Sequence, residues 1–280
     1  MLDHKNKSKK VKEFFETDQK PWEDFYYRNR VVADMYWSRT NASLKFANRY
    51  FPNECRVLEI GSGPGHLSLE LLNLGYDVVS CDIALRMASQ TRQRTGKKNV
   101  VVADICSLPF QPKSFDAIVL IGVISYVSDP VAVLENMSLL LKRDGVLLIS
   151  SPNMNLLFSA INRKIKGALT KRGLLKPEPI TNNSFFENEC TYYIATEFNM
   201  LVSAIGYSCL GSVNIGFGRV KFLNTHVFPE ALDIAISKFL SWLSRLPGFR
   251  WLSRYSFANV ACFRVNRAER ILDMDLAQPG

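Results

Sequence analysis

Residues 57–66 read VLEIGSGPGH, an apolar run that leads into three alternating glycines. The run predicts a buried strand, and the amphipathic segment that begins at Leu67 predicts a helix. Glycine at Gly61, Gly63 and Gly65 permits positive φ and removes the Cβ that would keep a ligand away. The following helix would direct its free N–H groups and its positive dipole end at the turn. The stretch predicts a strand, a ligand-binding turn and a helix.

The spacing of the glycines narrows the choice of ligand. A dinucleotide fingerprint needs G-x-G-x-x-G, whereas this turn reads G-x-G-x-G and has His66 where the third dinucleotide glycine belongs. The phosphate loop G-x-x-x-x-G-K-[ST] is absent as well. The turn alone leaves a bound ligand and a purely structural turn equally open.

Acidic residues end the next two predicted strands. Residues 76–82 form a second strand that ends in Asp82, and residues 99–103 form a third that is followed by Asp104. An acid at the end of the second strand, about 20 residues after the glycine turn, is placed to bind ribose hydroxyls. Ligands of parallel sheets bind at the carboxyl ends of the strands, so Asp82 and Asp104 favour a nucleotide-like ligand.

Further strands alternate with helical segments along the chain. Short β-branched or leucine-rich runs separated by helical periodicity are typical of βαβ units in a parallel sheet. After the third strand the expected elements are strand 115–121, helix 131–141, strand 146–150, strand 207–215 and strand 257–265, and Asp129-Pro130 signals the start of the helix. The fold class is therefore α/β.

Residues 55–152 resemble the core of the class I (seven-strand, Rossmann-like) S-adenosylmethionine-dependent methyltransferases, especially the small-molecule and quinone-biosynthesis group. The matching segments are residues 57–65, Asp82, residues 103–105, residues 115–118, residues 127–130 and residues 142–146. The resemblance implies a doubly wound seven-strand sheet with the last strand antiparallel, an N-terminal helical cap and a C-terminal helical insertion. It also implies S-adenosyl-L-methionine as cofactor.

The domain organisation follows from the resemblance and from shifts in composition. The expected parts are a basic flexible tail (1–20), an N-terminal helical cap (21–54), the cofactor-binding core (55–152), a basic lid or insertion with a helix (153–205), C-terminal strands with a helical insertion (206–266) and a tail (267–280).

The resemblance also implies cofactor-binding roles. The glycine turn would pass under the methionine and ribose, Asp82 would bind the ribose hydroxyls, and Asp104 would accept the adenine amine. Glu59 would hold the turn and the methionine amino group. The full expected set is Glu59, Gly61, Ser62, Gly63, Gly65, Asp82, Ile83, Asp104, Ile105, Ile121 and Gly122.

The catalytic residues are less defined. Many relatives carry an acid–histidine pair shortly after the fourth strand, where this chain reads Ser125-Tyr126. The sulfonium is an activated methyl donor, so transfer needs positioning and no metal. A hydroxyl acceptor would need a base, and the candidates are Tyr126 and His226, while His66 is expected to cap or pack the helix after the turn. Tyr126, with an ordinary pKa near 10, is expected to position the acceptor.

The N-terminal cap is rich in aromatic residues that would wall the acceptor pocket in the resembling family. Most of them are expected to pack the cap onto the sheet. The pocket candidates are Tyr26, Tyr27, Arg30, Trp37 and Arg39.

Composition limits the class of protein. The chain has 280 residues, 47% of them hydrophobic, and a net charge of +9. It has no uncharged run of 18 residues and no visible signal peptide, so a membrane span and secretion are not expected. The six cysteines are scattered without a CxxC pair, which predicts buried thiols in a reducing, cytoplasmic compartment.

Two segments offer a choice between packing and membrane contact. Residues 154–177 carry six basic residues and no acid, on a near-helical apolar spacing, and residues 231–246 carry an apolar helical stripe. For the second segment, packing against the core or cap is favoured. The alternative is peripheral contact with anionic lipid, or a long hydrophobic substrate.

Three functions remain open. The leading hypothesis is an S-adenosylmethionine-dependent methyltransferase acting on a small-molecule or lipid-like acceptor, most often at oxygen, with carbon and nitrogen as alternatives. The second is an RNA methyltransferase, suggested by the positive charge but lacking the Asn/Asp-Pro-Pro-Phe/Tyr motif after the fourth strand. The third is a non-catalytic partner subunit with the same fold.

Overall fold

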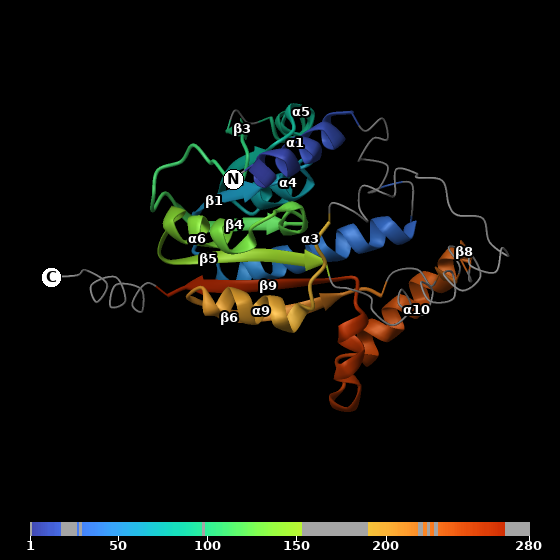
Figure 1. The fold of residues 1–280 in the computed structure, drawn as a ribbon. Helices are drawn as coiled ribbons and strands as arrows, with labels where there is room; N and C mark the ends of the chain where they lie inside the picture. The colour runs from blue at the N-terminus through green and yellow to red at the C-terminus, as the bar shows by residue number, and fades with distance from the viewer. Residues whose placement is uncertain are drawn as a thin grey trace.

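A seven-stranded sheet forms the centre of the structure (Figure 1), a computed structural model that describes residues 2–17, 27, 30–96, 99–152, 190–217, 221–222, 225–226 and 229–266. The strand order is β3-β2-β1-β4-β5-β9-β6. The strands are β1 (Arg56–Ile60), β2 (Asp77–Asp82), β3 (Val100–Val102), β4 (Phe115–Ile121), β5 (Leu141–Pro152), β6 (Tyr207–Ile215) and β9 (Ala258–Val265).

The sheet is parallel except for its last strand in the chain. β1 pairs in parallel with β2 and β4, β2 with β3, and β4 with β5, whereas β9 runs antiparallel to both β5 and β6. The Rossmann-like, doubly wound sheet with an antiparallel last strand is thus confirmed. A separate two-stranded ribbon joins β7 (Lys221–Phe222) to β8 (Thr225–His226).

Helices cover both faces of the sheet. They are α1 (Leu2–Thr17), α3 (Arg30–Tyr50), α4 (His66–Asn73), α5 (Leu85–Thr95), α6 (Pro130–Leu140), α9 (Ala195–Ala204), α10 (Glu230–Leu243) and the 3₁₀ helices η1 (Ile124–Tyr126) and η2 (Pro247–Tyr255). Side chains alternate along each strand, so Leu58 joins the core beneath α6 and α9, while Val57 joins the core beneath α3 and α4. Both strand faces are buried, which explains the continuous apolar runs.

The structure extends β5 beyond its expected start. The sequence predicts a strand over residues 146–150, but residues 143–145 also lie within β5, at a shift of register between Phe115 and Ala117 of β4. Asp144 adopts a φ of 60°, in the left-handed region. The added part of β5 therefore contains an irregularity of the strand.

Residues 2–17 form helix α1, so the prediction of a flexible tail is wrong for this segment. Its helix packs beside α5 (Figure 1), and Val11 is buried. The Glu16 carboxylate accepts hydrogen bonds from the backbone N–H groups of Leu85, at 2.6 Å, and Arg86, at 3.2 Å. Ala84, the N-cap residue of α5, supplies no side-chain acceptor, so Glu16 satisfies these N–H groups from another helix.

The cysteines are all free, but they are not all buried. Cys55, Cys81 and Cys262 are buried within the sheet region, as expected. Cys106 and Cys209 are exposed, which corrects the expectation of buried thiols for these two. Cys209 lies in β6, the outermost strand of the sheet, where one side of the strand has no neighbour.

A buried carboxyl group ties β1 to β2 and α4. Glu59 pairs with Ser80 across the two strands and accepts a hydrogen bond from Ser68 of α4, whose hydroxyl in turn lies 3.0 Å from that of Ser80. Glu59 is 3% exposed, and burial raises the pKa of its carboxyl to about 8, although the Ser68 hydroxyl opposes this shift. At neutral pH the folded protein therefore holds a proton that the unfolded chain has released.

This group predicts a pH dependence of stability. Because the folded pKa lies above the unfolded value, the free energy of unfolding should fall as pH rises from about 5 to about 8. Glu59→Gln should remove this pH dependence of the free energy of unfolding, which is on the order of a few kcal/mol between about pH 5 and pH 8. Glu135→Gln, at an exposed position, should keep it. Urea unfolding at several pH values measures the slope, and equal slopes for wild type and Glu59→Gln would contradict the assignment.

Candidate functional site

Two adjoining cavities lie at the carboxyl ends of β1, β2 and β4. The small cavity has a volume of about 60 Å³, and the large cavity has a volume of about 370 Å³. Gly61, Asp82, Val123 and Tyr126 line both, so the two form neighbouring parts of one site. This is the edge of the sheet where the sequence predicts a ligand.

The three glycines of the turn have different roles. Gly61, Gly63 and Gly65 all have positive φ, at 72°, 54° and 82°. A Cβ at Gly61 would lie 2.2 Å from the side chain of Val123, and one at Gly65 would lie 2.8 Å from the backbone of Thr91. A Cβ at Gly63 would meet no atom within 4 Å. The expectation that all three make room for a ligand is therefore corrected, since Gly61 and Gly65 admit neighbouring protein atoms.

Asp82 links the glycine turn to the end of β2. One oxygen of its carboxyl accepts a hydrogen bond from the Gly63 N–H at 2.9 Å, and the other accepts one from the Ala84 N–H at 3.0 Å. The side chain is 7% exposed, and burial raises the pKa of its carboxyl to about 6 against the effect of these hydrogen bonds. A carboxylate offers about four acceptor positions, so these contacts leave part of its capacity for a ligand.

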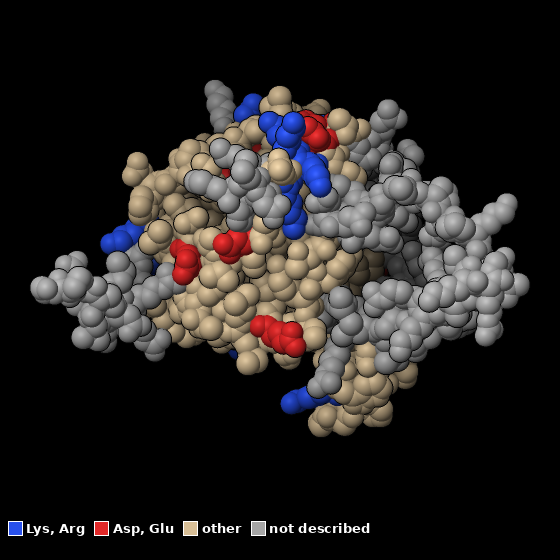
Figure 2. Space-filling model, in the orientation of Figure 1, with Lys and Arg blue, Asp and Glu red and all other residues tan. Residues whose placement is uncertain are grey.

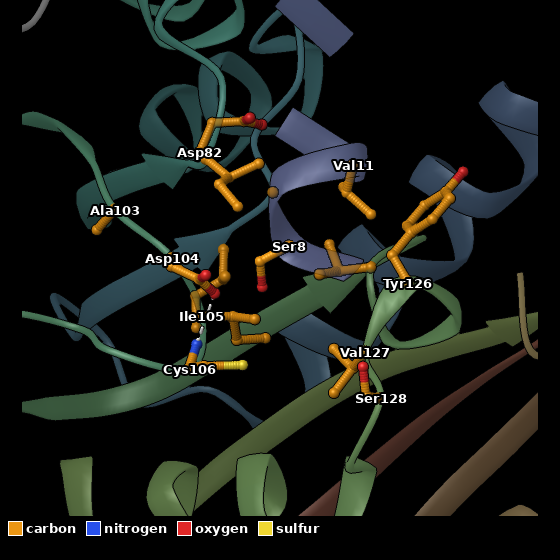
Figure 3. A pocket seen from close by; sticks show the side chains of 14 residues that line it. Ser8, Val11, Asp82, Ala103, Asp104, Ile105, Cys106, Tyr126, Val127 and Ser128 are labelled. Atoms are coloured by element: carbon orange, nitrogen blue, oxygen red, sulfur yellow. Dashed lines mark hydrogen bonds between the residues drawn. The ribbon is translucent and has the colours of Figure 1, made fainter. Parts of the chain in front are cut away.

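The small cavity is an apolar slot with an acid at its edge. Figure 3 shows Asp104 and Ile105 on one side, and Ser8 and Val11 of α1 nearby; Ile83 lines the same cavity. One oxygen of Asp104 accepts the Cys106 N–H at 2.9 Å. Such a slot suits a flat ring that donates a hydrogen bond at its edge.

The large cavity contains one basic side chain. Arg39 is the only Lys or Arg among the described residues that line it, and Asp82 is the only acid. The Arg39 guanidinium lies over the ring of Tyr36, 4.7 Å from its centroid, and close beside Gly122. Gly122 donates its N–H to the Ser150 hydroxyl at 2.8 Å, which holds the end of β4 against β5. The cavity can therefore receive an anionic group near Gly122.

Tyr126 stands where the two cavities meet. Its ring packs edge-on against Phe15 of α1, with centroids 5.6 Å apart, and its hydroxyl forms a hydrogen bond with the Cys190 thiol. Burial, the largest cause, raises the pKa of Tyr126 well above 10. Its hydroxyl thus remains protonated at neutral pH, which suits a positioning role and not that of a base.

The structure brings some of the expected cofactor residues to the cavities. Ile83, Asp104 and Ile105 line the small cavity, while Ser62, Ile121 and Gly122 line the large one. Glu59 lines neither, because its carboxyl is directed to Ser68, and its expected role toward the methionine amino group stays a prediction.

Among the expected acceptor residues whose side chains the structure describes, Arg39 lines a cavity, whereas Tyr27 and Trp37 do not. The rings of Tyr27 and Trp37 pack instead near His66, with centroids 5.7 Å and 5.6 Å from the imidazole. Tyr26 lies outside the described residues, and the structure describes only the backbone of Arg30, at the start of α3. The large cavity is lined instead by residues that the sequence analysis did not select, namely Phe15, Tyr36, Met87, Cys190 and Tyr192. Tyr36 could have been found, because it lies three residues before Arg39 on the same helical face.

The structure places two of the histidines, His226 and His66, on separate elements. His226 lies in β8, paired with Lys221, but its side chain is outside the part of the chain that the structure describes, so its catalytic role stays a prediction. His66 is buried at the start of α4, and its Nδ1 lies 3.3 Å from the Arg94 guanidinium. Burial, with Arg94 second, lowers its pKa to about 4. Within the described part of the chain, no three His, Cys, Asp or Glu side chains form a metal-binding group.

Comparison with known proteins identifies the core. Residues 58–149 match a family described as a methyltransferase domain. A demethylmenaquinone methyltransferase from Beutenbergia cavernae is 33% identical over 117 residues, which cover 42% of this chain and 47% of the relative. A ubiquinone biosynthesis O-methyltransferase from Xanthomonas campestris pv. campestris is 32% identical over 105 residues, or 35% and 43% of the two chains. The chain thus spans about half the length of these curated relatives.

Solved structures share the fold over nearly the whole chain. The magnesium protoporphyrin IX methyltransferase from Synechocystis PCC 6803, with bound SAH, has a TM-score of 0.60 at 14% identity and covers 93% of this chain and 100% of its own. The N-methyltransferase NodS from Bradyrhizobium japonicum WM9, in complex with S-adenosyl-l-homocysteine, has a TM-score of 0.55 at 15% identity, covering 92% and 98%. The core of this chain is therefore a methyltransferase domain, and the chain has the fold of the class I S-adenosylmethionine-dependent methyltransferases.

Proposed function

We propose that this protein is an S-adenosylmethionine-dependent methyltransferase that acts on a small-molecule or lipid-like acceptor, most often at oxygen. The observation that carries the proposal is the Asp82 carboxyl, held by the Gly63 N–H between the two cavities. The match to a methyltransferase domain and the names of the relatives support it.

Each cavity would hold a different part of the cofactor. In the small cavity Ile83, Ile105 and Val11 would pack against the adenine ring, and Asp104 would accept its amine. Asp82 would bind the ribose hydroxyls with its remaining acceptor positions. In the large cavity Arg39 would pair with the methionine carboxylate, because it is the one basic side chain among the described lining residues.

The chain's contribution to methyl transfer would be positioning. The bound cofactor supplies an activated methyl group on a sulfonium. Gly122 and Tyr126 border the large cavity, and they would align the acceptor for in-line displacement, a proximity effect that can contribute several kcal/mol. Tyr126, which is protonated at neutral pH, would donate a hydrogen bond to the acceptor.

The remaining lining of the large cavity favours a flat, apolar acceptor. Tyr36, Tyr192, Phe257 and Phe15 contribute aromatic rings. Among the described residues no histidine lines either cavity, so an acceptor hydroxyl that ionises readily, as in phenols and hydroquinones, fits the site. The relatives named for menaquinone and ubiquinone biosynthesis support this substrate class.

A cytoplasmic location with peripheral contact to anionic membrane is part of the proposal. The free cysteines and the net charge of +9 support it. Among the described residues, no helix combines the length and the apolar character that crossing a bilayer requires.

Asp82→Asn tests the proposed function. It should weaken binding of S-adenosylhomocysteine by about 1.5–3 kcal/mol, because a hydrogen bond to a charged group is lost, and reduce transfer of labelled methyl from S-adenosylmethionine to hydroquinone acceptors. Titration calorimetry and methyl incorporation measure the two effects, with Asp77→Asn at the other end of β2 as the control. Wild-type protein that neither binds the cofactor nor transfers the methyl group would refute the function.

Gly63 and Gly65 should respond differently to alanine. Gly63→Ala should fold with a loss of about 1–2 kcal/mol from the left-handed backbone, yet lose cofactor affinity because its methyl group enters the site. Gly65→Ala should lose more stability, because its methyl group would collide with the Thr91 backbone. Urea unfolding and cofactor titration separate the effects, and wild-type affinity in Gly63→Ala would count against a ligand at this turn.

A further inference from the structure

Helix α10 has its polar side turned inward and its apolar side exposed. Asp233 is 1% exposed, and Ser237, also buried, accepts the Phe217 N–H at 2.9 Å. On the opposite side Phe239 and Trp242 are 56% and 55% exposed. The helix does contact the cap helix α3, as expected, but part of its apolar stripe stays exposed, and Figure 1 shows α10 and η2 projecting from the sheet.

The exposed apolar surface continues from α10 into η2. We call it the α10 face, and its members are Leu232, Phe239, Trp242, Leu246, Phe249 and Trp251. Phe239 and Trp242 pack together, with ring centroids 5.9 Å apart. Single exposed apolar residues are common on proteins, but six on two consecutive elements mark an interaction surface.

Basic residues border the α10 face. From residue 238 to residue 255 the sequence has four basic residues and no acid, and those whose side chains the structure describes are Lys238, Arg245 and Arg250. In Figure 2 the described surface of this region is mostly tan with one blue patch at its edge. An apolar face with two tryptophans and flanking cations is typical of segments that lie in a membrane interface.

A cavity of about 510 Å³ lies between α3, β6 and α10 beside this face. Four basic side chains line it, namely Lys45, Arg49, Lys238 and Arg245, and Trp242 belongs to both the cavity and the α10 face. Asp34 is the only acid among its described lining residues, and it pairs with Lys238 at 3.6 Å. The cavity thus keeps a net positive charge next to the apolar surface, which suits a phosphate group.

We propose that the α10 face docks on an anionic phospholipid bilayer. The aromatic residues enter the boundary between headgroups and acyl chains, and the basic cavity receives headgroup phosphates. η2 ends at Tyr255, and Phe257 and Ala258, which follow Ser256, line the large cavity. Docking would therefore bring a lipophilic acceptor close to the site, a point that rests on the proposed function.

A second copy of the chain fits this face less well than a bilayer does. The apolar stripe of α10 spans residues 232–246, about two heptads, whereas helix pairing is indicated by at least three or four. Two copies would also bring Lys238 and Arg245 of one chain near the same cations of the other. An anionic surface is complementary to these charges.

Vesicle flotation tests the proposal. Wild-type protein should bind vesicles that contain phosphatidylglycerol and not vesicles of phosphatidylcholine alone, with tryptophan emission shifted to shorter wavelength and binding weakened by salt. Trp242→Ala/Trp251→Ala should bind at least tenfold more weakly. Arg245→Glu/Arg250→Glu should also bind more weakly, by about fivefold or more for each charge.

Matched variants control for general surface effects. Leu139→Ala/Met200→Ala removes exposed apolar residues elsewhere, and Arg143→Glu removes an exposed cation elsewhere; both should bind vesicles as wild type does. All variants should keep wild-type affinity for S-adenosylhomocysteine, so a failure of docking is distinguished from a failure of the proposed function.

Four results would overturn the proposal. One is equal binding to both kinds of vesicle, and another is unchanged binding by the tryptophan variant. The third is a dimer, seen by light scattering and lost in the tryptophan variant, without vesicle binding, which would assign the face to a second copy. Binding of inorganic phosphate without binding of vesicles would likewise replace the bilayer by a free anion.

Discussion

The hydrogen bond from the Gly63 N–H to the Asp82 carboxyl is the contact on which the site depends. It joins the turn after β1 to the end of β2, and it forms because Gly63 adopts a left-handed φ of 54°. The Thr91 hydroxyl holds the same residue from α5 by donating to the Gly63 carbonyl at 2.7 Å. With the turn so restrained, Asp82 lines both cavities.

Local signals predicted the sheet, the glycine turn and the positions of Asp82 and Asp104, because strands buried on both faces and turns with positive φ leave a clear sequence pattern. Other features depend on tertiary contacts and could not be predicted from the sequence. Residues 2–17 are lysine-rich and resemble a tail, yet Glu16 docks them on α5. Periodicity showed that α10 is amphipathic without showing which side is buried, and only the structure reveals that Asp233 faces inward. The spacing of residues along α3 also does not reveal that Arg39 lines the large cavity while Trp37 packs near His66.

The core of the fold and the elements that flank it have different roles. The core supplies a turn and two acids at the carboxyl edge of the sheet, the arrangement that binds a nucleoside in such folds. The flanking elements α1, α3, α10 and η2 supply features that differ between members of a common fold. Helix α1 lines the small cavity, and α3 places Arg39 in the large one. Helix α10 and η2 present an apolar and basic surface. A resemblance confined to the core therefore does not predict the site residues that come from the flanking elements.

The most direct measurement is a crystal structure of the protein with S-adenosylhomocysteine. The account predicts adenine in the small cavity beside Asp104 and Ile105, the ribose hydroxyls on Asp82, and the carboxylate at Arg39 in the large cavity. A ligand bound elsewhere, or a ribose without contact to Asp82, would contradict it.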